Sequence, residues 1–391
     1  MFSKLICFLV ITLLLSLNSC TAKKPNNNLS GSKINNSTKA YSETKVIYSK
    51  NFSIEYTNDY KIINIFSADE KHKLIFQYLL LPKDSPIPNG YSQAMIVRIP
   101  INSIISLSSL YIGFLERLGL LDKLIAVDKF QYVSSPKVWS LIDSGKIYEV
   151  GESYNLNIEE IYKLKPGLIL TYGNGNPFVD ANPKLIEFGI KVASTTIHLE
   201  TTPLARAEWI KFIAAFFNYE SKANKIFDSL ALKYNKLVSM TKNIENRPTV
   251  FTEALVGGIW FEPGGKSFMA NLLKDAGADY IWKDDNSTGS LRLTYEQVFA
   301  KAHNADFWVN VLFWSKFSDA LKNDPRNAKF KAYQAKNIYN YNRLVNKYGF
   351  YQYWEDSVVN CDILLSDLIK IFHPELLPGY KLFYYKRLEN K

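Results

Sequence analysis

Hydrophobic positions follow three different patterns along the chain. Residues 46–100 contain short β-rich runs, several with alternating apolar and polar positions, separated by polar and turn residues. This pattern predicts an antiparallel β preamble. Its strands are expected at residues 46–48, 52–56, 62–66, 74–78 and 96–100.

From residue 101 the pattern changes to apolar strands that alternate with amphipathic helices, which is typical of a parallel α/β sheet. The alternation occurs twice, in residues 101–202 and again in residues 244–391. We expect strands at 104–107, 124–127, 168–171, 192–193, 249–252 and 307–311. We expect helices at 111–118, 159–164, 183–188, 267–276, 294–300, 329–335 and 361–371.

Residues 203–243 read as two helices that link the halves. Pro203 is a good first-turn residue for a helix to about residue 217, and a second helix follows over 220–242 with lysines opposite its apolar face. At 1.5 Å per residue, the second helix would span roughly 35 Å. The predicted fold class is therefore α/β, with two lobes that each contain a mainly parallel sheet flanked by helices. One long helix joins the lobes, and the preamble packs on the first lobe.

One helix-start pattern occurs in both lobes, in segments 157–162 and 294–299. Each segment opens with an N-cap residue that has Glu or Gln three places later, as in a capping box. The cap pairs are Asn157 with Glu160 and Thr294 with Gln297. Glu159 and Glu296 are left free at the second helical position. Each acid could simply complement a helix dipole, worth about 0.3–1 kcal/mol, but the matched placement favours a function.

The N-terminal residues predict a lipoprotein leader. Lys4 precedes an apolar stretch, and residues 17–20 end in Ser19 and Cys20. This end resembles the lipobox of bacterial lipoproteins, in which the cysteine is lipidated, and an ordinary cleaved signal peptide is the alternative. We expect a signal peptide at 1–19 and a disordered polar tether at 20–45. No later apolar run reaches about 18 residues, so the expected location is the periplasmic side of the cell envelope, anchored through Cys20.

Composition narrows the function classes. The formal charge of +10 is spread over single lysines, which makes a nucleic-acid partner improbable and would suit an anionic ligand or membrane surface. If the leader is cleaved and Cys20 is lipidated, Cys361 is the remaining cysteine. Neither an intramolecular disulfide nor a cysteine metal cluster is then expected. The four histidines lie far apart in sequence, which argues against a dedicated metal site. Residues 264–267 fail as a phosphate loop because Trp260 stands where a glycine is needed.

Aromatic residues make up 14% of the chain, and we expect some of them to line a ligand site. Ligands of α/β sheets bind in the loops that follow the carboxyl ends of the strands. Packing under long loops is the alternative role for each residue. The candidates are Phe130, Tyr132, Tyr154, Tyr172 and Asn174 in the first lobe, and Trp260, Arg292, Trp314, Tyr353 and Trp354 in the second.

Four ordered segments carry a family resemblance. Residues 157–170 read Asn-Ile-Glu-Glu-Ile-Tyr-Lys-Leu-Lys-Pro-Gly-Leu-Ile-Leu, and segments 116–127, 272–278 and 295–298 add further matches. Together they resemble the periplasmic binding proteins for iron-siderophores, haem and vitamin B12. Gly167 stands where that family usually has Asp. Ser153 and Ser290 replace tryptophans that cobalamin binders can carry.

The resemblance implies a non-enzymatic, monomeric protein without a cofactor of its own. Such a protein binds a chelate between two lobes and delivers it to the permease dimer and ATPase subunits of an ABC importer. Glu159 and Glu296 would dock onto permease arginines. The expected ligand is an iron chelate, either a siderophore or haem, with cobalamin as the alternative. A secreted hydrolase that uses Glu253 and Glu262 is a remote alternative, because no third orienting group is evident.

Overall fold

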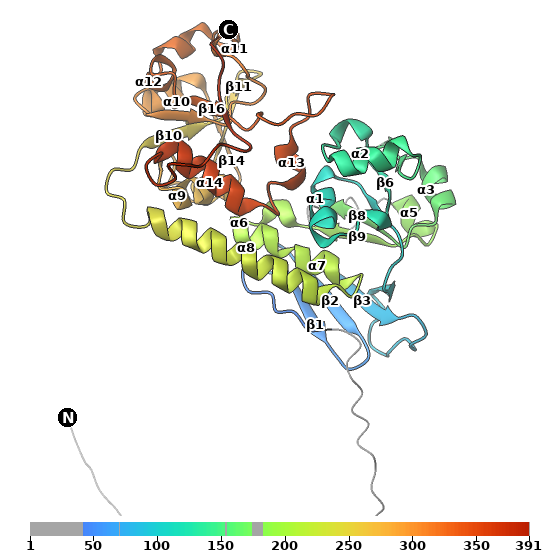
Figure 1. Ribbon diagram of the computed structural model, residues 1–391. Helices are drawn as coiled ribbons and strands as arrows, with labels where there is room; N and C mark the ends of the chain where they lie inside the picture. The colour runs from blue at the N-terminus through green and yellow to red at the C-terminus, as the bar shows by residue number, and fades with distance from the viewer. Residues whose placement is uncertain (1–41, 70, 153–154, 174–182, 391) are drawn as a thin grey trace, which may run out of the picture. The chain divides into compact units, whose positions relative to one another are not determined.

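Two mainly parallel sheets flanked by helices form the body of the protein, which confirms the predicted fold class (Figure 1). The computed structural model describes residues 42–69, 71–152, 155–173 and 183–390. The predicted signal peptide, Cys20, Tyr154 and Asn174 lie outside the described residues. All the described residues belong to one unit of the chain, residues 40–391.

The sheet of the first lobe is parallel throughout, with strand order β7-β6-β5-β8-β9. Its central strands are continuous apolar runs because helices cover both faces. The strands are β5 (Ile104–Ser106), β6 (Leu124–Val127), β7 (Tyr148–Glu149), β8 (Leu168–Tyr172) and β9 (Val192–Thr195). The helices are α1 (Ser109–Leu118), α2 (Pro136–Asp143), α3 (Ile158–Leu164) and α5 (Pro183–Glu187).

The main sheet of the second lobe has the order β13-β10-β15-β16-β17, parallel except for its last strand. The strands are β10 (Thr249–Thr252), β13 (Asp279–Tyr280), β15 (Phe307–Val309), β16 (Ile338–Asn340) and β17 (Lys386–Arg387). The helices are α9 (Phe268–Asp275), α10 (Tyr295–Ala302), α11 (Phe317–Asn323), α12 (Lys331–Gln334), α13 (Gln352–Asp356) and α14 (Cys361–Phe372).

A small antiparallel sheet in the second lobe was not predicted. It consists of β11 (Leu255–Val256), β12 (Ile259–Pro263) and β14 (Ser290–Leu293). Gly257 and Gly258 both have positive φ, as the tight turn between the first two strands requires. The short strands lie between the regular strand and helix signals, where sequence periodicity is too brief to detect them.

The linking segment contains three helices instead of two. The predicted helix over 203–217 is divided at Trp209 into α6 (Pro203–Glu208) and α7 (Ile210–Ala215). The long helix is confirmed as α8 (Glu220–Thr241), whose 22 residues extend about 33 Å at 1.5 Å per residue. Figure 1 shows α8 passing alongside both lobes.

The preamble is a four-stranded sheet of β1 (Phe52–Tyr56), β2 (Lys61–Phe66), β3 (Leu74–Pro82) and β4 (Met95–Ile99). The first three strands are antiparallel as predicted, but β4 joins β3 in parallel. The prediction was wrong there because residues 83–94 form a crossover and not a hairpin. The sheet packs on the linking helices, with the Phe52 ring 4.5 Å from that of Trp209 and the buried Lys61 paired with Glu220.

Residues 46–48, predicted as a strand, wrap around a buried carboxylate instead. The Glu208 carboxylate accepts backbone N–H bonds from Ile47, Tyr48 and Ser49 at 2.8, 2.6 and 2.8 Å. It also pairs with the buried Lys211 at 2.8 Å. Because these N–H groups are satisfied by a side chain of α6, the segment forms no strand ladder.

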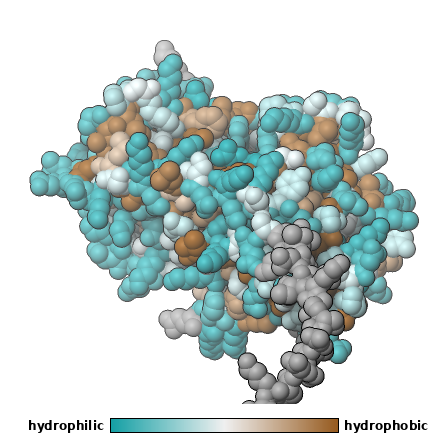
Figure 2. Space-filling model, turned by 60° about the horizontal axis from the view of Figure 1, so that its bottom comes forward, coloured by the Kyte–Doolittle hydropathy of each residue, from teal (hydrophilic) through white to brown (hydrophobic). Residues whose placement is uncertain are grey.

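Hydrophilic residues dominate the surface when the preamble side of the molecule is turned toward the viewer (Figure 2). Hydrophobic residues form small separate patches on that face. Among the helices of the described residues, none is long and apolar enough to cross a membrane.

Candidate ligand site and lobe surfaces

The strand order locates a candidate ligand site in each lobe. In the first lobe the chain leaves β5 toward β6 and β7, and then returns to the other side of β5 at β8. In the second lobe the same reversal occurs between β10 and β15. Ligands of open α/β sheets bind outside the carboxyl ends of strands at such reversals. We call the corresponding place in the second lobe the strand-end site.

Two residues at the strand-end site have unusual backbone conformations. Glu253 follows β10 with φ 63°, and Asn310 follows β15 with φ 61°. Non-glycine residues with positive φ are uncommon, and they concentrate at ligand sites when the surrounding structure fixes them. Here the Trp308 indole N–H donates to the Glu253 carbonyl at 2.7 Å, and the Tyr385 hydroxyl donates to the Asn310 side chain at 2.6 Å.

Five aromatic rings, which we call the aromatic cluster, gather at the same strand ends. They are Phe313, Tyr341, Tyr351, Tyr353 and Trp354. Tyr341 stacks on Tyr353 at 4.2 Å, and the Trp354 ring meets Tyr341 edge-on at 5.4 Å. Phe313 is 84% exposed and Trp354 is 49% exposed. Large exposed rings that pack on buried aromatic side chains provide a surface for an apolar or conjugated ligand.

Two charged groups beside the cluster, Glu253 and Arg206, interact electrostatically with its tyrosines. Burial raises the pKa of Glu253 to about 7, and its charge is electrostatically coupled to Tyr341 and Tyr353. Arg206 of α6 is also coupled to Tyr353, and burial lowers its pKa to about 10. The guanidinium lies 3.8 Å over the Phe268 ring and donates to backbone carbonyls of His198 and Glu200 at 2.9 Å each.

The first lobe contributes aromatic residues at its own strand ends. Tyr172 ends β8, is 52% exposed, and lies 6.3 Å from the His198 ring. Phe130 and Tyr132 belong to a short 3-10 helix after β6. The Tyr132 hydroxyl donates to Glu152 at 3.0 Å, and its ring contacts Phe350 of the second lobe at 5.2 Å.

Residues 346–355, which we call the bridge, connect the second lobe to the first. The Asn346 amide donates to the carbonyls of Gln131 and Val133, both at 2.8 Å. The Glu355 carboxylate accepts the Ser134 N–H at 2.5 Å. Helix α13 of the bridge lies so close to α1 that a Cβ on Gly113 would be 2.5 Å from the Glu355 carbonyl oxygen. The lobes are therefore joined by side-chain contacts as well as by α8.

The structure separates the predicted ligand residues into two groups. It brings Tyr353 and Trp354 together in the aromatic cluster, and it places Tyr172, Phe130 and Tyr132 at first-lobe strand ends. For these five residues ligand contact stays a prediction. Four other residues of the site were not predicted as ligand residues: Phe313, Tyr341, Glu253 and Arg206. For Phe313 the sequence contained a signal, because polar and aromatic residues directly follow strand 307–309.

Three predicted residues in the second lobe lie elsewhere. Trp260 is fully buried on β12 and donates its indole N–H to the Thr252 carbonyl at 2.9 Å, so the prediction that its ring faces a ligand is wrong. Trp314 is also a core residue, 6% exposed and 5.1 Å from the Trp308 ring. Arg292 is exposed on β14 and lies 5.3 Å over Phe261, in the antiparallel sheet and not at a parallel strand end.

The two acids predicted to dock have different local surroundings. Thr294 and Gln297 form the predicted capping box. The Asn157 side chain accepts the Glu160 N–H at 3.1 Å, as in a capping box. The backbone N–H of Asn157 donates to the Val150 carbonyl instead of the Glu160 side chain, so the box is incomplete. Glu159 is exposed. Glu296 is 72% exposed but was wrongly predicted to be free, because its carboxylate pairs with Arg326 at 2.9 Å.

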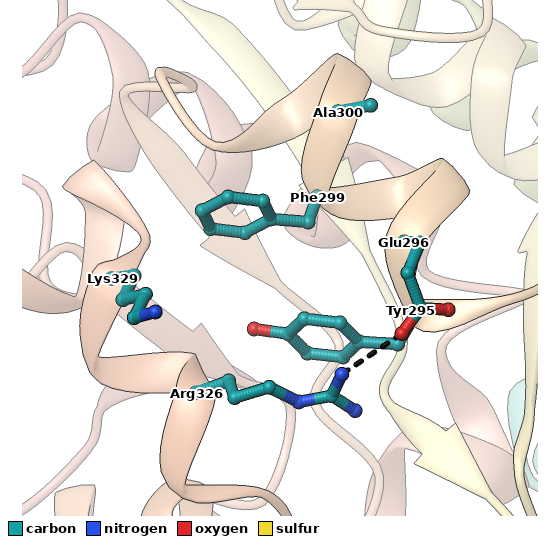
Figure 3. A pocket seen from close by; sticks show the side chains of 6 residues that line it. All are labelled: Tyr295, Glu296, Phe299, Ala300, Arg326 and Lys329. Atoms are coloured by element: carbon teal, nitrogen blue, oxygen red, sulfur yellow. Dashed lines mark hydrogen bonds and ion pairs between the residues drawn. The ribbon is translucent and has the colours of Figure 1, made fainter.

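Each of these acids borders a surface hollow that also contains aromatic and basic side chains. The first-lobe hollow has a volume of about 510 Å³ and is lined by Ile158, Glu159, Tyr162, Lys163, Glu187 and Phe188. The second-lobe hollow has a volume of about 230 Å³ and is lined by Tyr295, Glu296, Phe299, Ala300, Arg326 and Lys329. Figure 3 shows the Arg326 guanidinium extending beneath the Tyr295 ring toward Glu296.

The acids considered for hydrolysis do not form an accessible pair. Glu262 is fully buried and accepts bonds from the Thr252 and Tyr280 hydroxyls at 2.6 and 2.9 Å. A substrate at the strand-end site could not reach it in this arrangement. Within the described ranges, no group of three or more His, Cys, Asp or Glu side chains is placed to hold a metal ion.

Comparisons with known proteins agree with this architecture. An uncharacterized lipoprotein of Methanocaldococcus jannaschii is 28% identical over 374 residues, covering 89% of this chain and 87% of the relative. A periplasmic binding protein from Veillonella parvula has a similar fold, with TM-score 0.56, 16% identity, and coverage of 83% of this chain and 98% of that one. A possible iron-binding (periplasmic solute-binding) protein from Staphylococcus epidermidis has TM-score 0.53, 21% identity, and coverage of 70% and 98%.

The sequence profile described as periplasmic binding protein matches residues 104–343, from the first strand of the first lobe to the residues just after β16. This range is more than half of the chain and includes the strand reversals of both lobes. The resemblance seen in the sequence is confirmed, and the chain belongs to the periplasmic binding protein family.

Proposed function

We propose that this protein is the lipid-anchored substrate-binding component of an ABC importer, which captures an iron chelate at the strand-end site and delivers it to the permease. The anchor would be Cys20, at the end of the lipobox-like segment, and the M. jannaschii relative is described as a lipoprotein. The choice of iron is supported by the S. epidermidis structure, which is described as possibly iron-binding.

The aromatic cluster supports the capture step. A siderophore or haem presents a large rigid surface, and burial of that surface against rings contributes roughly 25 cal/mol per Å². Phe313 and Trp354 offer exposed rings at the strand reversal, and the buried Tyr341 and Tyr353 hold Trp354 in place. The ligand would enter between these rings and Tyr172 of the first lobe.

The observation that carries the delivery step is the repeated surface arrangement on the two lobes. Each lobe exposes one carboxylate in the first turn of a capped helix, beside a hollow with aromatic walls. Two such places suit a partner with two similar subunits, in which an arginine meets each acid and an apolar side chain enters each hollow. Charges at the rim of such an interface mainly guide encounter and orientation.

The Glu296–Arg326 pair is compatible with docking. Both side chains are about half exposed or more, so solvent screens the pair and it contributes little to stability. Exchange of Arg326 for a permease arginine would therefore cost little. Arg326 would keep its second partner, Asp324, at 2.7 Å.

The double variant Glu159→Ala, Glu296→Ala tests this proposal. Neither acid is needed for the core, so chelate affinity should stay within about twofold of wild type and stability should fall only slightly, by the small helix-dipole contribution of each acid. Delivery should fail, because both contacts to the permease are removed. The measurement is chelate uptake and stimulated ATPase activity with the reconstituted importer in vesicles.

A matched control removes one exposed, lysine-paired acid from each lobe that lines neither hollow. Asp122 pairs with Lys123, and Glu389 pairs with Lys386, both at 2.8 Å. The double variant Asp122→Ala, Glu389→Ala has the same net charge as the test variant and should transport normally. Normal uptake by the test variant at limiting protein concentration would refute the docking role.

A further inference from the structure

Glu253 occupies the most constrained position of the strand-end site. Its backbone is left-handed at the end of β10, and its carbonyl is fixed by the Trp308 indole. Its carboxyl group is largely buried and electrostatically coupled to Tyr341, Tyr353 and Tyr385. Gly or Asn would adopt this left-handed backbone with less strain than Glu, so the backbone conformation alone does not account for a Glu at this position.

No group in the described part of the chain compensates the charge of this carboxyl. Burial is the one cause that shifts its pKa, and neither a cation nor a hydrogen-bond donor among these residues acts in the opposite direction. Other buried acids of the protein differ in this respect. Glu262 receives bonds from Thr252 and Tyr280, and Glu355 receives the Ser134 N–H. The Glu253 side chain keeps partial solvent exposure, so a ligand donor can reach it and take the place of water.

Two cations near the strand ends are already engaged within the protein. The guanidinium of Arg206 is already stacked on Phe268 and bonded to two backbone carbonyls. In the first lobe, the acid that follows β6 is Asp128, 7% exposed, and Lys129 beside it is paired with Glu152 at 2.8 Å. A site for a highly negative chelate would present free cations at these strand ends.

We propose that Glu253 is a specificity-determining residue that accepts hydrogen bonds from the ligand, and that the ligand is an uncharged or positively charged chelate with N–H or O–H donors. This inference rests on the proposed function and deepens it, because it selects the charge class of the chelate. The proposal favours ferric hydroxamates and amide-rich corrinoids, which are uncharged or positively charged. It disfavours ferric catecholates and haem, because both carry negatively charged groups.

The test compares four chelates by quenching of tryptophan fluorescence in the full chain without its leader. Ferrioxamine B is positive, ferrichrome and cyanocobalamin are uncharged, and ferric enterobactin is strongly negative. Wild type should bind at least one of the first three about 100-fold or more tighter than ferric enterobactin. Glu253→Gln should weaken that binding about tenfold or more, because its amide is a poorer acceptor than the carboxylate and cannot carry charge. Glu253→Lys should reduce the preference further and improve binding of ferric enterobactin.

Glu262→Gln is the matched control, because Glu262 is a buried acid of the same lobe that is bonded inside the core. It should alter stability without changing the order of the four affinities. Tightest binding of ferric enterobactin by wild type would overturn the charge class while leaving chelate capture intact, and this result depends on no variant. Equal affinities of wild type and a folded Glu253→Gln for the preferred chelate would overturn the role of Glu253. Failure of all four chelates to bind would overturn this inference, and the proposed function would be refuted as well if haem also failed to bind.

Discussion

At the scale of single residues, buried carboxylates determine several local structures. Glu208 organises residues 47–49 through three backbone bonds, and Glu253 is held in a left-handed conformation beside tyrosines. Sequence periodicity reports which positions are apolar, but it does not report which acid lies in the interior. An acid inside an apolar environment needs donors from distant segments, and those contacts arise only in the folded chain.

Glu208→Ala should destabilise the protein strongly. The change leaves the buried Lys211 without its carboxylate and removes the acceptor of three backbone N–H groups, so we expect a loss of about 3–5 kcal/mol. Urea unfolding measures the loss, and limited proteolysis should cut the chain near residues 44–51. Glu208→Gln keeps an acceptor and should lose less. A near-zero effect of Glu208→Ala would mean that residues 46–49 are held by other contacts.

The candidate site was only partly predictable, because the sequence does not show which way a side chain near a strand end faces. The rule that ligands lie after strand ends correctly directed attention to the loops that contain Tyr172, Tyr353 and Trp354. It also selected Trp260 and Trp314, because a tryptophan in a short strand or turn has the same local sequence whether it faces the core or the solvent. Trp260 was assigned to a loop because β11, β12 and β14 are too short to show a period of two.

At the scale of elements, long regular patterns were predicted well and connections were not. Helix α8 and the parallel strands β5, β6, β8, β9, β10 and β15 were correctly predicted, whereas the two-residue strands β7 and β13 were too short to be detected. The parallel pairing of β4 was missed because pairing direction depends on the path of the intervening loop. The bridge was also missed, because it joins Asn346 to residues 131 and 133, which lie more than 200 positions earlier in the chain.

Asn346→Asp should loosen the bridge while leaving its own loop intact. The Asn346 side-chain oxygen accepts the N–H groups of Tyr348 and Phe350 at 2.9 Å each, and a carboxylate can keep those bonds. The same carboxylate cannot donate to the carbonyls of Gln131 and Val133, so about 1–3 kcal/mol of bridge stability should be lost.

Hydrogen exchange provides the measurement for the bridge. The Ser134 amide, which donates to Glu355 of the bridge, should exchange about tenfold faster or more in Asn346→Asp. Asn243→Asp makes the same chemical change at an exposed position after α8 and should leave exchange at Ser134 unchanged. Unchanged protection of Ser134 in Asn346→Asp would show that α13 packing on α1 holds the lobes together without the Asn346 bonds.

At the scale of the whole molecule, buried acids should give the protein an unusual pH dependence of stability. Burial raises the pKa of Asp128 and Glu253 to about 7, and that of Glu262 and Glu355 to about 8. The usual values for these side chains are 3.8 for Asp and 4.5 for Glu. Below the usual values both the folded and the unfolded chain hold these protons, so the acids impose no penalty on folding.

As the pH rises above about 4.5, the unfolded chain releases these protons while the folded chain retains them, and the free energy of unfolding decreases. The decrease should continue to about pH 8, where the folded state also ionises. We therefore expect urea unfolding to report a higher free energy of unfolding at pH 5 than at pH 8. Glu355→Gln cannot ionise and keeps an acceptor for Ser134, so it should reduce the difference by on the order of 2 kcal/mol. A free energy of unfolding that increases from pH 5 to pH 8 would show that these acids are ionised and compensated in the folded protein.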